Sequence, residues 1–311
     1  MPWLELILTT DRERAPLIEA ALENAGALAV TFGDAGNEPQ LEPPLGTTPL
    51  WGQVLITGLF EPDPASRQTI ETLAKALRDL LTGPARLEQI ADQAWEHTWR
   101  DDFAPTCYGT RLWVCPRGQR PLGEPPDAVV VELDPGLAFG TGHHPTTALC
   151  LRWLDGLALA GTRLIDYGCG SGILAIAALK LGAAEALAVD HDPQALEATR
   201  ANAADNGVAS RLRILSPEDL SIEPADFLMA NILAGPLIDL APRLADLVRS
   251  GGRLALSGLL VDQTQAITTA YASWFKLDPP VREEDWILIA GQRRPTPVAE
   301  VPVRPGSGNG G

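Results

Sequence analysis

The chain has 311 residues, 45% of them hydrophobic, and its formal net charge at pH 7 is −16; this length is sufficient for two globular domains. The excess of acidic residues disfavours direct binding to nucleic acid, because phosphate contacts require clustered lysine and arginine, and a basic protein would be the more favourable partner. No apolar run approaches the ~18 residues that cross a bilayer and the first residues carry no basic targeting segment, so we expect a cytoplasmic protein with no membrane partner.

Residues 1–92 are predicted to form a small domain with an α+β fold. Alternating apolar residues indicate strands, and apolar residues at helical spacing indicate helices. The predicted strands are residues 3–10, 28–32, 53–60 and 86–90, and the predicted helices are residues 15–24 and a segment that begins near Pro64. The order β-α-β-β-α-β is typical of a ferredoxin-like domain, a platform from which no function follows.

The segment 93–104 is predicted as a linker helix between this domain and a second domain at residues 105–293. Its aromatic residues Trp95, Trp99 and Phe103 recur every four positions and therefore lie on one helical face. We expect this face to pack against the protein core; the alternative is a patch that receives a substrate peptide. Residues 294–311 lack apolar periodicity and are predicted to be a disordered tail.

A glycine-rich loop in the second domain reads Asp134-Pro-Gly-Leu-Ala-Phe-Gly-Thr-Gly-His-His-Pro-Thr-Thr147. Thr146 and Thr147 begin a helix, and the free amides at a helix start bind carboxylates. We therefore predict that this loop, including Phe139 and Gly140, covers a cofactor that carries a carboxylate. The adjacent histidines of the loop cannot share one helix face, and the four cysteines of the chain lack Cys-x-x-Cys spacing, so no metal site is predicted.

A buried strand, a glycine turn and a helix follow at residues 163–181. The turn residues Gly168, Gly170 and Gly172 lie where the chain must bend sharply and where a ligand must approach the backbone closely. A dinucleotide-binding turn has the pattern G-x-G-x-x-G, but its third glycine position is Ile173 here, which disfavours an oxidoreductase.

Two acidic residues complete this motif. Asp166 precedes the turn, and Asp190 ends the next predicted strand, where its carboxylate can accept hydrogen bonds from both ribose hydroxyls. An acid followed by G-x-G-x-G, with a second acid one strand later, is the pattern of class I S-adenosylmethionine (SAM) methyltransferases. The motif therefore predicts SAM as the cofactor, bound by Asp166, Asp190 and the three glycines of the turn.

Strands and helices alternate through the remainder of the second domain. Strands are predicted at residues 186–189, 212–215, 226–233 and 253–257, helices at residues 193 to about 206, 236–248 and 266–271, and an antiparallel terminal pair at residues 275–278 and 286–290. The fold class is therefore α/β, a Rossmann-like seven-stranded sheet with an antiparallel last strand. Asn231, at the polar end of its strand, should emerge at the same carboxyl edge as Gly168 and Asp190.

In combination these motifs resemble those of the ribosomal protein L11 methyltransferase (PrmA) family. The resemblance rests on the loop 134–147, the turn 166–172, Val189-Asp-His-Asp-Pro193 and Ala230-Asn-Ile-Leu-Ala234, and it covers roughly residues 1–293.

The resemblance implies SAM-dependent methylation of lysine side-chain and α-amino groups of ribosomal protein L11 of the large subunit. It also implies that the small domain recognises this protein substrate and that the linker lets it move. The family's cofactor contacts fall on Thr147, Gly168, Asp190 and Asn231.

The role of Asn231 is open between two alternatives. Methyl transfer to an amine requires alignment and an unprotonated nucleophile more than a catalytic base. We predict that the carboxamide oxygen of Asn231 orients the amine, which makes it the candidate catalytic residue, and a contact to the cofactor alone is the alternative. Other functions also stay open: a SAM-dependent methyltransferase of another protein, RNA or a small molecule, and a SAM-binding regulator without catalysis.

Overall fold

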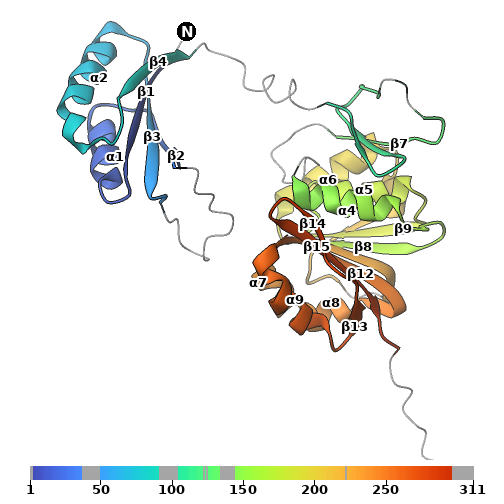
Figure 1. Ribbon diagram of the computed structural model, residues 1–311. Helices are drawn as coiled ribbons and strands as arrows, with labels where there is room; N and C mark the ends of the chain where they lie inside the picture. Colours follow the sequence, from blue (N-terminus) through green and yellow to red (C-terminus); the bar gives the residue numbers. More distant parts are fainter. Residues whose placement is uncertain are drawn as a thin grey trace, which may run out of the picture. The chain divides into compact units, whose positions relative to one another are not determined.

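The computed structural model of the chain describes residues 3–36, 50–90, 104–121, 123, 125–133, 144–220 and 223–295. It divides the chain into two compact units, Met1–Thr98 and Trp99–Gly311, drawn in blue and in green to red in Figure 1. Three predicted segments lie wholly or mostly outside the described residues, namely residues 93–103 of the linker helix, residues 134–143 of the glycine-rich loop and residues 296–311 of the tail.

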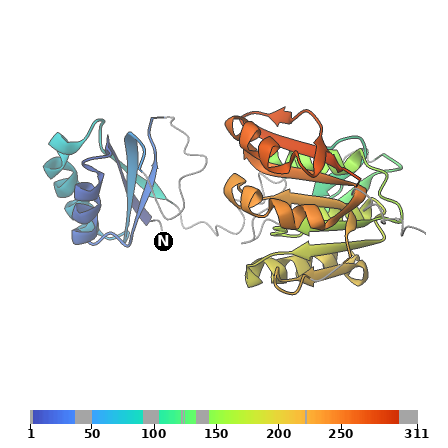
Figure 2. The ribbon, with the colours of Figure 1, turned by 90° about the horizontal axis from the view of Figure 1, so that it is seen from below.

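The smaller unit is a four-stranded antiparallel sheet with both of its helices on one face (Figure 2). Its elements are β1 (Trp3–Asp11), α1 (Ala15–Asn24), β2 (Ala29–Asp34), β3 (Gln53–Phe60), α2 (Pro64–Ala76), the 3-10 turn η1 (Arg78–Leu80) and β4 (Arg86–Ile90). The strands lie in the order β2-β3-β1-β4. The succession of strands and helices is the predicted one, and the assignment to the ferredoxin-like class stays a prediction.

Alternation along the strands places the core of this unit between the sheet and the helices. Every second residue of β1 is buried, and the three leucines among them form one apolar cluster with Ile18 and Leu22 of α1 and Ile70 of α2. Helix α2 begins sharply because the Asp63 side chain accepts hydrogen bonds from the first free amides of the helix. The other face of the sheet consequently carries the remaining, half-buried residues of β1 and β3.

The larger unit contains an eight-stranded mixed sheet. Seven strands lie in the order β10-β9-β8-β11-β12-β15-β13, and β14 pairs with β15. The bounds are β8 (Arg163–Tyr167), β9 (Glu185–Val189), β10 (Leu212–Leu215), β11 (Ala225–Asn231), β12 (Val248–Leu260), β13 (Phe275–Leu277), β14 (Val281–Glu283) and β15 (Trp286–Arg293). Because β15 is antiparallel to β12 while β8 to β12 are parallel, the predicted α/β sheet with an antiparallel last strand is confirmed.

Helices cover both faces of this sheet (Figure 1). One face carries α4 (Pro145–Asp155), α5 (Ile173–Lys180) and α6 (Pro193–Asp205), and the other carries α7 (Ala234–Asp239), α8 (Ala241–Asp246) and α9 (Thr264–Tyr271). Short 3-10 turns are η2 (Ala209–Arg211) and η3 (Val261–Gln263). Two separate apolar cores result, one on each face. In α5 every residue from Ile173 to Leu179 is buried, which explains why its sequence is apolar all round rather than amphipathic.

The order of the strands determines where a ligand can bind. From β8 the chain proceeds outward through β9 and β10, and it then returns to β11 on the other side of β8. Parallel sheets form a crevice at the carboxyl ends of the strands where their order reverses in this way, and ligands bind there. The glycine turn, Asp190 and Asn231 follow or end β8, β9 and β11 at this edge.

A separate three-stranded sheet lies at the start of the larger unit. It consists of β5 (Thr106–Tyr108), β6 (Leu112–Cys115) and β7 (Val129–Glu132), in that order. Asn206, at the end of α6, attaches β7 to the domain: its Oδ1 accepts from the Glu132 amide at 2.8 Å and its Nδ2 donates to the Glu132 carbonyl at 2.7 Å. A side-chain amide thus continues the hydrogen bonding of β7 as a further strand would.

The helix predicted at residues 236–248 is instead two short helices, α7 and α8, and the single-helix prediction is wrong. Leu240 ends α7 and also precedes α8. The break has a physical cause in Pro242, which lacks an amide hydrogen and is tolerated in the first turn of a helix but not in its interior. The last predicted helical residue, Val248, begins strand β12.

Candidate functional site

The glycine turn after β8 has a backbone that other residues rarely adopt. Gly168, Gly170 and Gly172 have φ angles of 79°, 53° and 79°, in the left-handed region that glycine enters without a steric penalty. The amides of Gly168 and Cys169 both donate to the carbonyl of Val189, at 2.7 and 3.1 Å. The turn is therefore hydrogen-bonded to the end of β9.

Two of these glycines are also required by close packing. A Cβ atom on Gly168 would lie 2.3 Å from Cγ2 of Ile232, and one on Gly172 would lie 2.7 Å from Cγ2 of Thr199. Gly172 thus lets α5 approach α6, and Gly168 lets the residue after Asn231 pack against the turn. The sequence pattern indicated the three glycines but not these different roles.

Asp190 connects the end of β9 to the glycine turn. Its Oδ2 accepts from the Gly170 amide at 2.9 Å, its Oδ1 accepts from the Asp192 amide at 3.0 Å, and the residue is 9% exposed. A carboxylate offers about four acceptor positions, so two backbone bonds leave capacity for about two further donors. The arrangement orients a charged acceptor that can still receive hydroxyl groups.

A cavity of ≈ 220 Å³ lies at this edge of the sheet. Five of the predicted site residues line it together: Thr147, Gly168, Gly170, Asp190 and Asn231. The remaining lining residues are Cys169, Ile173, Leu174, His191 and Ile232, which sequence reasoning did not assign to the site. Each of them directly flanks a motif residue or begins α5, so proximity to the motifs was the signal that could have found them.

The carboxamide of Asn231 is held by the start of α4. Its Nδ2 donates to the Thr147 hydroxyl at 3.3 Å. The position of α4 is fixed from the sheet, because the buried Ser257 hydroxyl is 3.2 Å from the Thr146 carbonyl and 3.2 Å from the Ile287 carbonyl of β15. With its NH₂ group directed at Thr147, Asn231 presents its carboxamide oxygen as the free acceptor.

His144 precedes α4 and caps it. Its Nδ1 accepts from the Thr146 amide at 3.3 Å and lies 2.8 Å from the Thr146 hydroxyl, and its ring packs edge-on against Trp286 with centroids 4.7 Å apart. Burial lowers the pKa of His144, which favours the neutral imidazole that can accept these bonds. The Thr146 side chain does not line the cavity, and cofactor binding by Thr146 stays a prediction. Phe139 and Gly140, also predicted to bind the cofactor, lie outside the described residues.

Asp166 lies beneath the turn rather than in the cavity. It is completely buried, its Oδ2 accepts from the Ala175 amide at 3.1 Å, and its Oδ1 has no hydrogen-bond partner. Burial raises the pKa of Asp166 to about 7, against the opposing effect of the Ala175 bond, and the nearby charge of Asp190 raises it further. Asp166 therefore holds the start of α5 from below, and its direct contact with the cofactor, like that of Gly172, stays a prediction.

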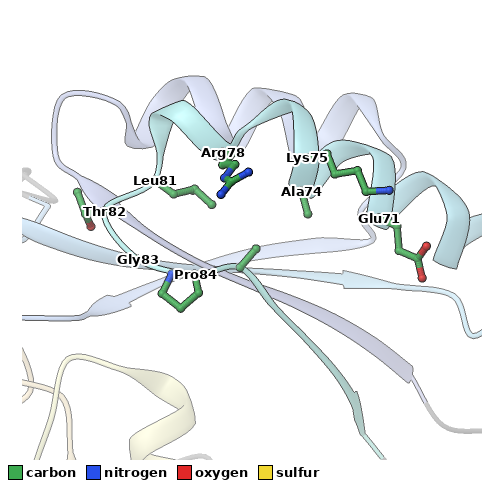
Figure 3. Close-up of a pocket in the computed structure, with 9 residues that line it drawn as sticks. Glu71, Ala74, Lys75, Arg78, Leu81, Thr82, Gly83 and Pro84 are labelled. Atoms are coloured by element: carbon green, nitrogen blue, oxygen red, sulfur yellow. The ribbon is translucent and has the colours of Figure 1, made fainter.

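A wider depression of ≈ 660 Å³ exists in the smaller unit, between α2 and the segment that leads into β4 (Figure 3). Its charged lining residues Glu71, Lys75 and Arg78 are exposed on the helix side. The depression has no left-handed glycine and no buried carboxylate among its lining residues. The smaller cavity at the carboxyl edge of the large sheet is therefore the better candidate for the cofactor site.

The residues of that cavity fit SAM. Asp190 can accept the hydrogen bonds of a ribose, the bare backbone of the glycine turn permits close approach, and Ile173, Leu174 and Ile232 give apolar walls for a flat base. A parallel sheet closed by an antiparallel strand, with a glycine turn after β8 and an acid at the end of β9, defines a class I SAM-dependent methyltransferase.

Comparison with known proteins identifies the family. The family model "Ribosomal protein L11 methyltransferase (PrmA)" matches residues 2–294. The ribosomal protein L11 methyltransferase of Pseudomonas paraeruginosa is 52% identical over 94% of this chain and 99% of its own length, and that of Pseudomonas savastanoi is 52% identical over 94% and 100%. The crystal structure of a ribosomal protein L11 methylase from Lactobacillus delbrueckii subsp. bulgaricus is 33% identical, covers 62% of this chain and 100% of its own, and has a TM-score of 0.57. The chain belongs to the ribosomal protein L11 methyltransferase family.

Two further findings concern membrane spans and metal sites in the described part of the chain. None of its helices is long and apolar enough to cross a membrane. Within the same residues, no three side chains of histidine, cysteine, aspartate or glutamate are grouped so that they could hold a metal ion.

The buried carboxyl of Asp166 should make stability depend on pH. Its folded-state pKa of about 7 lies above the ordinary 3.8, so its contribution is fully present below about pH 4 and is lost as the pH rises through about 7. Asp166→Asn removes the titration with little change in shape. Relative to the wild type, the variant should gain on the order of 2 kcal/mol of unfolding free energy between pH 5 and pH 8. Denaturant unfolding at the two pH values measures this, and a difference that does not change with pH would contradict it.

The packing of Gly168 against Ile232 should control cofactor affinity. Gly168→Ala introduces both an unfavourable φ and a clash with Ile232, whereas Gly161→Ala introduces only the unfavourable φ, because Gly161 has a φ of 76° and no neighbouring atom within 4 Å of an added Cβ. Gly161→Ala should lose about 1–2 kcal/mol of stability, and Gly168→Ala should lose more because the clash adds to the cost of its φ. Only Gly168→Ala should weaken SAM binding in calorimetry, by about tenfold or more. Equal SAM affinities for the two variants would show that Ile232 does not position the turn.

Proposed function

We propose that this protein methylates lysine side-chain and α-amino groups of ribosomal protein L11, with SAM as the methyl donor, in the cytoplasm. The family membership and the names of the relatives support the protein substrate. The observation that carries the chemistry is the neutral carboxamide of Asn231, which lines the cofactor cavity with its oxygen available to an incoming amine. The net charge of −16 favours a basic protein over a nucleic acid as the substrate.

The main requirement for the reaction is an unprotonated amine. When bound, the cofactor supplies a methyl group on an electrophilic sulfonium centre. A lysine with a reference pKa of ~10.4 is neutral only about once in 2,500 molecules at pH 7, equivalent to roughly 4.6 kcal/mol, whereas an α-amine with a pKa of ~7.7–8.0 costs only about 1 kcal/mol. The site must therefore favour the neutral form of lysine, and burial does so.

Asn231 suits this requirement because it accepts a hydrogen bond without carrying charge. A carboxylate at the same place would attract the ammonium form and hold the proton on the amine. The bond from Nδ2 to Thr147 fixes the carboxamide, so that its oxygen has one preferred direction in the cavity. We assign Asn231 the role of aligning the amine for in-line attack, a gain that comes from restricted orientation rather than from proton transfer.

The two units divide this function between them. We assign residues 105–293 to catalysis, because every described residue that lines the cavity follows Pro145. We assign residues 1–92 to recognition of the protein substrate, because the described residues among them form a sheet and an apolar core of their own. Residues 93–104 connect the two as the linker, and residues 294–311 form the tail.

Incubation of the full-length protein with labelled SAM and a mixture of purified ribosomal proteins tests the proposal. Label should appear on L11, and mass spectrometry should place it on lysine and α-amino nitrogens. Asp190→Ala serves as the control that should lose labelling, because removal of a charged acceptor should lower SAM affinity by about ten- to a hundredfold. Label in ribosomal RNA, or in no ribosomal protein, would refute the assignment.

Substitution of Asn231 separates its two possible roles. If the carboxamide aligns the amine, Asn231→Ala should lower kcat by about a hundredfold at saturating SAM and leave SAM affinity nearly unchanged. Asn231→Asp should move the rise of kcat with pH to higher pH, because the new charge stabilises the ammonium form of the substrate. A large loss of SAM affinity with an unchanged kcat at saturation would instead assign Asn231 to cofactor binding alone.

A further inference from the structure

The sheet of the smaller unit has a face that no described element of this unit covers. Both helices pack on the opposite face, where the apolar cluster of the unit lies (Figure 2). We call the uncovered side the open face, and its apolar side chains are Trp3, Ile7, Leu55, Leu59 and Ile90. All five are half-buried rather than fully exposed. An antiparallel sheet with one face in water normally presents mainly polar residues there, so an apolar open face is typical of an interaction surface.

The strand register alternates these apolar residues with polar ones across the open face. Trp3 of β1 lies opposite Ile90 of β4, and Leu59 and Leu55 of β3 lie opposite Glu5 and Thr9 of β1. Ile7 stands between these rows, opposite Thr57. Side chains directly opposite one another on neighbouring strands are ~4.5–5.5 Å apart at Cβ and diagonal neighbours are ~7–8 Å apart. Trp3 therefore faces Ile90 directly, and Ile7 lies diagonal to both Leu55 and Leu59.

Two acidic residues lie side by side on the open face, on the edge strand β4 and its neighbour β1. Glu5 of β1 is directly opposite Glu88 of β4. Burial, and secondly the charge of Glu88, raises the pKa of Glu5. Arg86 stands one row away, opposite Ile7, yet among the described residues neither glutamate takes part in an ion pair. Like charges opposed across a sheet destabilise it, so the pair weakens the isolated unit.

We propose that the open face docks the protein substrate through a basic segment, with a lysine or arginine of that segment placed between Glu5 and Glu88. This inference rests on the proposed function, which supplies a lysine-bearing protein as the occupant. The apolar stem of such a side chain can lie on the neighbouring apolar residues while its charged end meets the two carboxylates. Binding then converts a repulsive pair of charges into an attractive group of three.

The chemistry of the open face also decides against a nucleic acid. A phosphate backbone would bring further negative charge beside two carboxylates, of which one is half-buried. Aromatic residues that could stack on bases are limited to Trp3 among the open-face side chains named above. A cationic protein segment satisfies both the apolar residues and the acid pair, whereas an RNA would satisfy neither.

The test uses the full-length protein, purified ribosomal protein L11 as the probe, and two changes on the open face. Glu88→Lys, at an exposed position, should weaken binding of L11 in calorimetry by about tenfold or more, with a higher KM and an unchanged kcat. The double change Glu5→Gln with Glu88→Gln should also weaken L11 binding, and it should raise Tm because the repulsion is removed. A substitution that merely damaged the fold would lower Tm instead.

Glu23→Lys is the matched control, since Glu23 lies exposed on α1, on the helix side of the same sheet. It makes the same change of charge and should leave L11 binding unchanged, and SAM affinity should be unchanged in all variants. If the wild type labels L11 and the Glu88→Lys variant does so with the same KM, the docking face is wrong while the proposed function stands. Tighter L11 binding by the double variant, or competition by RNA for this face, would also overturn the proposal. If the wild type labels no ribosomal protein, the proposed function itself fails.

Discussion

The candidate site depends on how closely Ile232 is packed between two glycines. On one side the turn after β8 approaches the Ile232 side chain at Gly168, and on the other Gly258 of β12 approaches the Ile232 backbone, where a Cβ would lie 2.5 Å from the carbonyl oxygen. Both glycines have a φ of 79°. Because neither contact leaves room for a side chain, the segment that follows β11 can occupy only one place. Asn231, the residue before it, is thereby held at the carboxyl edge between β8 and β12.

The two carboxyl groups near the turn perform different tasks because their surroundings differ. Asp190 receives two backbone amides and borders the cavity, whereas Asp166 receives one amide in a fully buried position. Burial of Asp166 is tolerated because its partner, the Ala175 amide, lies in the first turn of α5, where the helix dipole favours negative charge. One acid is therefore available to a ligand, and the other supports the helix that carries the cavity's apolar wall.

The sequence was sufficient to predict elements whose structure follows directly from the local pattern of apolar and polar residues. The bounds of β3, β4 and β10 were predicted to the residue, and so was the end of β9, whereas β11 ends at Asn231 and not at residue 233. The pairing of β7 with the Asn206 side chain was not predictable, since it joins residues 74 positions apart and follows no periodicity. Strand β14 was not predicted, because two of its three residues are charged and such a composition is typical of a connecting loop. The apolar wall of the cavity escaped notice because buried residues of a helix and residues lining a ligand have the same composition.

The position of β15 has a consequence for the synthesis of the protein. This strand lies between β12 and β13 and also pairs with β14, although it is the last strand among the described residues. While the chain is being made, β13 therefore has no neighbour in the sheet, and the Ser257 hydroxyl lacks the Ile287 carbonyl that it contacts in the finished fold. The smaller unit, complete at β4, can fold long before that point. The support that Ile287 gives to the Ser257 hydroxyl, and through it to the start of α4, is therefore assembled later than the smaller unit.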